Sequence, residues 1–146
     1  MNRYAYSIFC DDIRQEIGQK MSMMGIYNGE LHVSALPTVM PKLCIAVFCV
    51  TPIEEPFKSL TIRANSDDII LNEISIPEAD LSQMQFGISS KSTPEDPLKS
   101  MYLGVNINLM PFVIEKKQTI TVSAIADGIE LIAGKLRIKH SPNQVI

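Results

Sequence analysis

The sequence lacks most of the residues that carry metal or redox chemistry, with no tryptophan, three cysteines and two histidines in 146 residues. Cys10, Cys44 and Cys49 are odd in number, lie within apolar runs and show no C-x2-C spacing. This excludes a disulfide framework and a zinc site of that spacing, and it is typical of a reducing compartment. The seven glycines form no phosphate-binding or dinucleotide-binding motif, and nucleophile-elbow and zinc-protease motifs are absent.

An excess of basic residues is also missing, because 13 lysines and arginines stand against 16 acidic residues and the net charge is −3. Nucleic-acid-binding proteins usually carry a basic stripe, so we expect no nucleic-acid partner. Lys135, Arg137 and Lys139 share one face of an expected strand. We interpret them as a solvated edge that discourages strand pairing, with an anionic partner as the alternative.

Long hydrophobic runs are absent as well. No segment approaches the about 18 apolar residues of a membrane span. Residues 4–10 are too few for the apolar region of a secretory signal. We therefore expect a cytoplasmic protein with no membrane partner.

Isoleucine is in excess, with 20 residues against 8 valines and 8 alanines. β-Branched residues pack well on a pleated, half-buried surface and favour strands. The chain is 46 % hydrophobic and 20 % charged, close to an ordinary globular composition. We expect one all-β domain over residues 1–146, large enough to bury its own core without a cofactor.

The N-terminal third predicts two strands, residues 4–17 and 21–27, separated by a turn at 18–20. A helix over 11–24 is the alternative, but two glycines would each cost its interior about 1 kcal/mol. The Asn-Gly pair at 28–29 follows and is a strong hairpin signal.

The middle of the chain predicts a linker between Pro37 and Pro41, then a central strand over 43–50 that is apolar on both faces. Residues 58–64 and 69–76 alternate around an Asn-Ser-Asp-Asp turn and predict a second hairpin. Ile62, Ile74 and Ile76 are expected to face inward there.

Residues 76–84 predict one or two helical turns, and residues 88–100 a loop. Residues 101–110 alternate with a period of two, which a helix does not satisfy. The core-facing residues are expected to be Leu103, Val105, Ile107 and Leu109, and the solvent-facing residues Tyr102, Gly104, Asn106 and Asn108.

Strands over 119–126 and 129–140 are expected to meet at Asp127-Gly128, with a bulge near Ala133-Gly134 where the inward set shifts by one residue. Ile129 and Leu131 are expected to face inward before the bulge, and Leu136 and Ile138 after it. About seven or eight strands joined by tight turns predict an antiparallel β-sandwich, with a small β-barrel as the alternative.

No catalytic constellation is evident in this pattern. His32 and His140 have no nearby nucleophile and are expected to be structural. The acidic pairs at 11–12, 54–55 and 67–68 are interpreted as solvated turns. Convergence of such loops with Asp127 on a calcium ion is the alternative.

Residues 10–16 are unusual because five of the seven are polar or charged directly after an apolar strand. Arg14 can form a forked ion pair with Asp12 or Glu16, which share its strand face. Such a segment either aligns a hairpin against a neighbouring strand or forms a binding surface.

Residues 10–27 follow the pattern C-D-D-x-R-x-E-x-x-x-K-x-S-x-x-G-x-Y, and Pro41-Lys-Leu-Cys44 comes later in the chain. The chain resembles a family of small bacterial and phage-associated proteins classed as a domain of unknown function. The resemblance implies a shared fold, a β-sandwich, and transfers no catalytic roles. It marks these positions as interaction candidates: Asp11, Asp12, Arg14, Glu16, Lys20 and Tyr27, with Gly25 beside them.

These observations favour a non-enzymatic interaction or accessory protein of bacterial or phage origin. Its partner is expected to be another protein or a second copy of the chain, and Met21, Met23, Met24 and Met110 are candidates for an adaptable contact. One alternative is a small-ligand-binding protein or hydrolase that uses the acidic residues and Arg14 in a cleft. Another is a structural component of a phage or secretion assembly.

Overall fold

The computed structural model describes residues 2–143, which form eleven strands and one helix. In chain order the elements are β1 (Tyr4–Glu16), β2 (Lys20–Ile26), β3 (Glu30–Val33), β4 (Thr38–Met40), β5 (Leu43–Pro52), β6 (Leu60–Ser66), β7 (Ile69–Ser75), α1 (Glu78–Ser89), β8 (Ser100–Leu109), β9 (Phe112–Ile114), β10 (Gln118–Ala126) and β11 (Ile129–His140).

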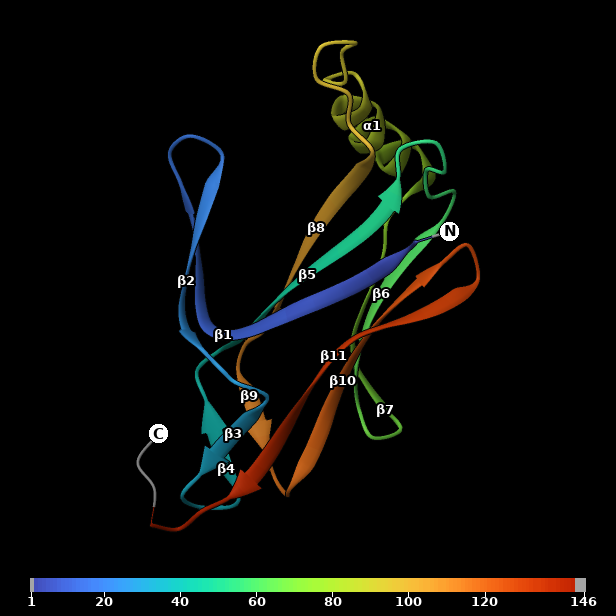
Figure 1. The fold of residues 1–146 in the computed structure, drawn as a ribbon. Coiled ribbons are helices and arrows are strands. Elements are labelled where there is room, and N and C mark those ends of the chain that lie inside the picture. The colour runs from blue at the N-terminus through green and yellow to red at the C-terminus, as the bar shows by residue number, and fades with distance from the viewer. Residues whose placement is uncertain (1, 144–146) are drawn as a thin grey trace.

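Two open sheets form a sandwich (Figure 1). The four-stranded sheet A has the order β2-β1-β5-β8, and the five-stranded sheet B has the order β3-β11-β10-β6-β7. Strands β4 and β9 form a separate pair. The predicted all-β sandwich is confirmed, and the sheets do not close into a barrel. The strand number exceeds seven or eight because β3, β4 and β9 have only three or four residues, too few for a clear alternating pattern.

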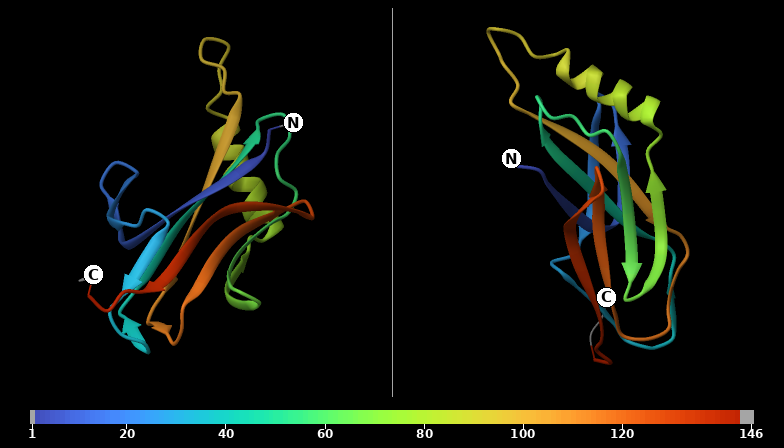
Figure 2. Two further views of the ribbon diagram at one scale, coloured as in Figure 1. Left: turned by 60° about the horizontal axis from the view of Figure 1, so that its bottom comes forward. Right: turned by 90° about the vertical axis from the view of Figure 1, so that its right-hand side faces the viewer.

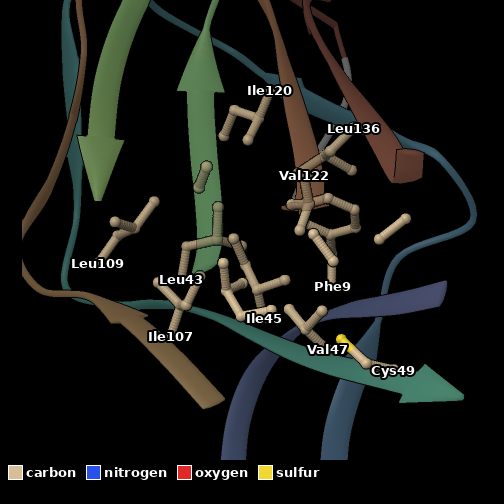
Figure 3. Packing of buried hydrophobic residues seen from close by; sticks show 14 of the residues in the cluster. Phe9, Leu43, Ile45, Val47, Cys49, Ile107, Leu109, Ile120, Val122 and Leu136 are labelled. Atoms are coloured by element: carbon tan, nitrogen blue, oxygen red, sulfur yellow. The ribbon is translucent and has the colours of Figure 1, made fainter. Parts of the chain in front are cut away.

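The core lies between the two sheets (Figure 3). Strand β5 contributes Leu43, Ile45, Val47 and Cys49 from one face, all fully buried. Sheet B supplies the opposing side chains, among them Ile120, Val122 and Leu136. The inward positions expected for isoleucine are confirmed in part, since Ile62, Ile107, Ile120 and Ile138 are buried while Ile74 and Ile76 are partly buried.

The tight turns expected from the sequence are present. Asp67 joins β6 to β7 and Asp127 joins β10 to β11, both with a φ of 51°. The expected bulge in β11 is confirmed, because the β10–β11 register shifts between Val122 and Ser123, opposite Gly134. Ile129 pairs with buried Ala126 but lies at the end of the sheet, so it is 65 % exposed and the expectation of a core position was wrong.

The Asn28-Gly29 turn does not form the expected hairpin. Strand β2 belongs to sheet A, whereas β3 crosses to sheet B and pairs with β11 in parallel, the one parallel pair among the described strands. Leu31 and Val33 of β3 are fully buried in the core. Burial of these two side chains between the sheets explains the crossing, which a local turn signal does not encode.

Two further expectations need correction. The segment between Pro37 and Pro41 is not only a linker, because β4 lies within it and pairs with β9. Lys135, Arg137 and Lys139 are exposed as expected, but only the part of β11 before Arg137 lies at the edge of sheet B, because β3 pairs with residues 137–140. The Lys139 ammonium lies 2.5 Å from the Glu30 carboxylate across this pair.

Helix α1 is longer than the one or two turns expected, and the loop that follows it begins at residue 90. Leu81 and Gln85 are its buried residues. The Gln85 side-chain amide forms two hydrogen bonds with the main chain of Phe57. It accepts from the Phe57 N–H at 2.7 Å and donates to the Phe57 carbonyl at 2.8 Å. This pair of bonds attaches the helix to the chain between β5 and β6. No helix within residues 2–143 is long and apolar enough to cross a membrane.

Arg3 closes the end of the sandwich where the chain begins, beside the β10–β11 turn (Figure 1). Its guanidinium donates to the Asp127 carboxylate at 2.7 Å, to the Thr51 hydroxyl at 2.9 Å and to the Glu55 carbonyl at 2.9 Å. The other Asp127 oxygen accepts from the backbone N–H groups of Lys58 and Ser59. This Arg3–Asp127 clamp therefore joins elements of both sheets.

Candidate functional site

The candidate motif lies in the β1–β2 hairpin, which extends away from the sandwich (Figures 1 and 2). The first part of β1 pairs with β5 and the second part with β2, and Cys10 pairs with both neighbours. Alternation along β1 places Asp11 on one face and Asp12, Arg14 and Glu16 on the other. The motif residues therefore do not converge on one site.

Asp11 fixes the base of the hairpin. The Tyr27 hydroxyl donates to its carboxylate, and burial and this carboxylate raise the pKa of Tyr27 above its ordinary value. Gly25 has a φ of 69°, and a β-carbon there would overlap the Asp11 carboxylate. The motif requires glycine at this position for both reasons.

Asp12 forms an ion pair that the sequence analysis did not identify. The Lys42 ammonium lies 2.5 Å from its carboxylate, and this hydrogen bond lowers the pKa of Asp12 while raising that of Lys42. Beneath the pair, the thiols of Cys10 and Cys44 donate to backbone carbonyls of β1. Burial raises the pKa of both thiols, so these buried cysteines stay protonated.

Arg14, Glu16 and Lys20 lie on the outer part of the hairpin. Glu16 and Lys20 are register partners, Arg14 is exposed, and none of the three forms an ion pair within residues 2–143. Ile17 at the tip is 95 % exposed. The arrangement supports a structural role for Asp11, Asp12, Gly25 and Tyr27 and leaves Arg14, Glu16 and Lys20 free for contact.

The acid–base alternative has little geometric support. A general acid at neutral pH needs a raised carboxyl pKa, whereas Lys42 lowers the pKa of Asp12. Among residues 2–143, no three side chains of His, Cys, Asp or Glu gather as metal ligands. Asp67 and Asp127 lie at opposite ends of sheet B, because Leu60 pairs with Ala126 and Ser66 with Ile120. The acidic turns therefore do not converge.

The histidines serve structural roles, as expected. The His32 ring lies 2.7 Å from the Ser141 hydroxyl and 3.2 Å from the Glu30 carboxylate. The His140 ring lies 3.2 Å from the Ser34 carbonyl. The contacts of His32 with Ser141 and of His140 with Ser34 connect the C-terminal end of β11 to the neighbourhood of β3.

A groove of about 640 Å³ lies between α1 and the segment after β5, with Phe86, Met101 and Ile53 among its lining residues. Gln85 also lines it, but both polar ends of that side chain are occupied by the Phe57 backbone. The groove presents no free buried polar group around which a ligand could be oriented.

A more distinctive surface lies on the side of sheet A that faces away from the core. Paired residues of neighbouring strands project to the same side of a sheet. The outer face, as we define it, consists of four cross-strand rows from β1, β5 and β8: Tyr4–Val50–Tyr102, Tyr6–Phe48–Gly104, Ile8–Ala46–Asn106 and Cys10–Cys44–Asn108.

Aromatic side chains gather at one end of the outer face. The Tyr6 ring stacks on Phe48 with centroids 5.0 Å apart, and Tyr4 lies 6.4 Å from Tyr6. The neighbouring Tyr102 side chain raises the pKa of Tyr4, chiefly through hydrogen bonding, and Tyr4 and Tyr102 flank Val50 in one cross-strand row. Val50 is only 1 % exposed, whereas Tyr102 is 55 % exposed. The rings cover the central strand and remain open to solvent themselves.

None of the residues of the outer face is charged. The outward side of sheet B is different, since it carries the Arg63–Glu73 ion pair at 2.6 Å together with exposed Lys135 and Arg137. The two solvent-facing sides of the sandwich therefore differ in chemistry. Charge depletion with aromatic enrichment is the composition of interface centres.

The sequence analysis missed this surface. It expected Tyr102, Gly104, Asn106 and Asn108 to face solvent, which is confirmed for all four. The alternation of Tyr4 and Tyr6 before Cys10 was the available local signal. Their alignment with Phe48 and Tyr102 depends on pairing between distant strands, which no local pattern specifies.

Comparison with known proteins adds a family without a function. A model described as a family of unknown function (DUF6941) matches residues 5–139. No curated protein and no solved structure matches the chain.

Proposed function

This chain belongs to the family of unknown function DUF6941, and we propose that it is a non-enzymatic protein that binds another protein through the outer face of sheet A. The family match covers both sheets and so includes all three strands of the outer face except Tyr4. The bacterial or phage origin and the cytoplasmic location expected from the sequence stay predictions.

The absence of charge on the outer face carries this proposal. One residue in five of the chain is charged, yet the twelve residues of these rows, eight of which reach the surface, include no charged group. Exposed tyrosines supply large contact areas with few rotatable bonds, and they are enriched among the residues that dominate binding energy. Asp12 and Lys42 lie next to the Cys10–Cys44 row and provide a polar rim.

The same absence defines the partner's chemistry. A charged group of the partner that docked on these rows would be buried without a counter-ion, which is costly. The partner surface is therefore an uncharged, largely apolar patch of a second protein. Hydrogen-bond acceptors on that patch would satisfy the Tyr4, Tyr6 and Tyr102 hydroxyls.

Affinity capture from cells that encode the chain tests the proposal. Tyr6→Lys and Tyr102→Lys each place a charge on the outer face, and Ser75→Lys places one at an exposed position of β7 in sheet B. We expect a specific captured protein whose affinity falls about thirtyfold in each tyrosine variant, the effect of losing one central interface residue. Ser75→Lys should capture as wild type does. Capture that is absent, or equal for all four proteins, would contradict the proposal.

A further inference from the structure

Strand β8 forms one edge of sheet A and pairs on one side only, with β5. Beyond the end of that ladder, the Ile53 N–H donates to the Lys99 carbonyl at 2.9 Å. The N–H and C=O of each residue in an antiparallel strand point to the same side, and the side alternates along the chain. Odd-numbered residues of β8 therefore face β5, and even-numbered residues face the free edge.

The free edge is long and regular. The main-chain groups of Tyr102, Gly104, Asn106 and Asn108 point outward along it, and the structure gives them no hydrogen-bond partner within residues 2–143. All four residues are exposed. Over the ten residues of β8 there is no charged side chain and no proline. Such an edge is a template for another strand.

The strands at the other three ends of the two sheets, β2, β3 and β7, carry features that prevent strand pairing. Strand β2 contains Lys20 and is kinked at Gly25, whose φ is 69°. Strand β3 has only four residues and includes Glu30. Strand β7 contains Glu73 and is irregular, because its register with β6 shifts between Ala64 and Asn65. The unprotected β8 edge is therefore an exception within this chain.

We propose that the β8 edge pairs antiparallel with β8 of a second copy of the chain and joins the two A sheets into one continuous sheet. This inference rests on the backbone of β8 and is independent of the binding partner proposed for the outer face. Pairing of identical strands about a two-fold axis is an isologous contact, which closes at the dimer.

The register follows from which residues face the edge. Even-numbered residues must pair with even-numbered residues, so the two-fold axis passes through a residue and not between two. An axis at Val105 pairs Tyr102 with Asn108 and Gly104 with Asn106 of the second copy. On the inner side it pairs Leu103 with Ile107 and Met101 with Leu109, which are buried within each copy's own core, and it places the half-buried Val105 opposite itself. An axis at Gly104 would instead place Lys99 opposite Leu109.

A second copy fits this edge because the outward-facing main-chain groups of the two strands match in this register and no charged side chain of β8 is placed opposite another. The pairing also brings the two outer faces side by side, with Tyr102 of each copy next to the joint. The result is one uncharged surface of twice the width.

The molar mass in solution tests the dimer. By size-exclusion chromatography with light scattering, we expect wild type at micromolar concentration to have about twice the 16.2 kDa mass of one chain. Asn106→Pro removes an outward N–H without touching the β5 ladder and should give the mass of one chain. Asn106→Ala keeps that N–H and should remain dimeric, as should Tyr6→Lys. A monomeric wild type, an open-ended assembly or a dimeric Asn106→Pro variant would overturn the proposal.

Cysteine trapping tests the register and remains informative if the proline variant fails to fold. Val105→Cys would face its own copy in a non-hydrogen-bonded pair, where Cα atoms about 4.5 Å apart allow a disulfide. Under copper-phenanthroline oxidation we expect a covalent dimer of this variant. Asn108→Cys, which faces Tyr102, and wild type, whose cysteines are buried, should stay uncrosslinked. Absence of the Val105→Cys dimer would overturn the proposed register and pairing.

Discussion

Gly25 has the most specific requirement for its residue type among the motif positions. Its positive φ and the adjacent Asp11 carboxylate exclude a β-carbon for two different reasons. The same carboxylate accepts from Tyr27, which connects the base of the hairpin to the sandwich. One local arrangement thus explains three positions of the motif: Asp11, Gly25 and Tyr27.

Substitution of Gly25 by alanine should destabilise the protein by about 2 kcal/mol or more, because a left-handed backbone strain of about 1 kcal/mol adds to the steric overlap. Gly18→Ala is the matched control, since Gly18 also has a positive φ but no atom lies within 4 Å of its would-be β-carbon. Chemical denaturation of both variants measures the difference. Equal losses of stability would show that the Asp11 carboxylate does not restrict position 25.

Burial also determines the protonation of the three cysteine thiols. It raises the pKa of Cys49 to about 12, and it raises the pKa of Cys10 and Cys44 as well. Cys44 and Cys49 lie on opposite faces of β5, as the spacing predicts, because only Cys49 joins the core between the sheets. The thiols are thus small apolar side chains in this fold.

Among the elements, α1 is attached to the sandwich by the buried polar residue Gln85 together with the apolar Leu81. Gln85 is 5 % exposed and satisfies both main-chain groups of Phe57. Gln85→Ala should lower the free energy of unfolding by about 3 kcal/mol, since it leaves a buried N–H and a buried carbonyl unpaired. Gln83→Ala, at an exposed position of the same helix, should change it by less than about 0.5 kcal/mol. Similar urea midpoints for the two variants would refute this role of Gln85.

Local elements followed from the sequence, whereas connections between distant elements did not. The β6–β7 and β10–β11 hairpins and the bulge near Gly134 depend on turn residues and alternation within a few positions. The crossing after Gly29 depends on burial of Leu31 and Val33, which local turn chemistry does not reveal. The short strands β4 and β9 exist only because they pair with each other.

The candidate site shows the same division. The sequence singled out Asp11, Asp12 and Tyr27, and the structure gives each of them a specific partner. It did not identify Lys42 as the partner of Asp12, nor the alignment of Tyr4, Val50 and Tyr102. Both depend on the register between β1, β5 and β8, and register is set by pairing across the whole sheet.

At the scale of the whole molecule, the Arg3–Asp127 clamp connects the start of the chain to the far turn of sheet B. Partial burial opposes ionisation of Asp127, but hydrogen bonds from Ser59, Arg3 and Lys58 outweigh it and lower its pKa. The clamp therefore stabilises the fold above the unfolded-state pKa of about 3.9, and this contribution is lost as the pH falls through the lower folded-state value.

Asp127→Asn should reduce the free energy of unfolding by about 2 kcal/mol at pH 7, because it weakens charge-assisted hydrogen bonds. The difference from wild type should shrink as the pH falls below the unfolded-state pKa of about 3.9, because the unfolded chain then binds a proton that the folded state resists. Urea denaturation at pH 7 and pH 3 gives the two differences. A difference that is the same at pH 7 and pH 3 would contradict the lowered pKa of Asp127.

The uncharged outer face is a property of the whole molecule, because it combines three strands that are far apart in the sequence. Strands β1 and β5 each carry four of the apolar side chains, and β8 carries one, Tyr102. Dimerisation through β8 would double the area over which this character extends. Binding of a protein partner to this surface is the central claim of our account.

Site-specific photocrosslinking in cells that encode the chain tests this claim most directly. A benzophenone amino acid is introduced at Tyr6 or Tyr102 on the outer face, or at Arg137 on the outward side of sheet B. The account predicts that positions 6 and 102 form a covalent adduct with the same protein, and that position 137 does not. Adducts formed equally from all three positions, or from none of them, would contradict it.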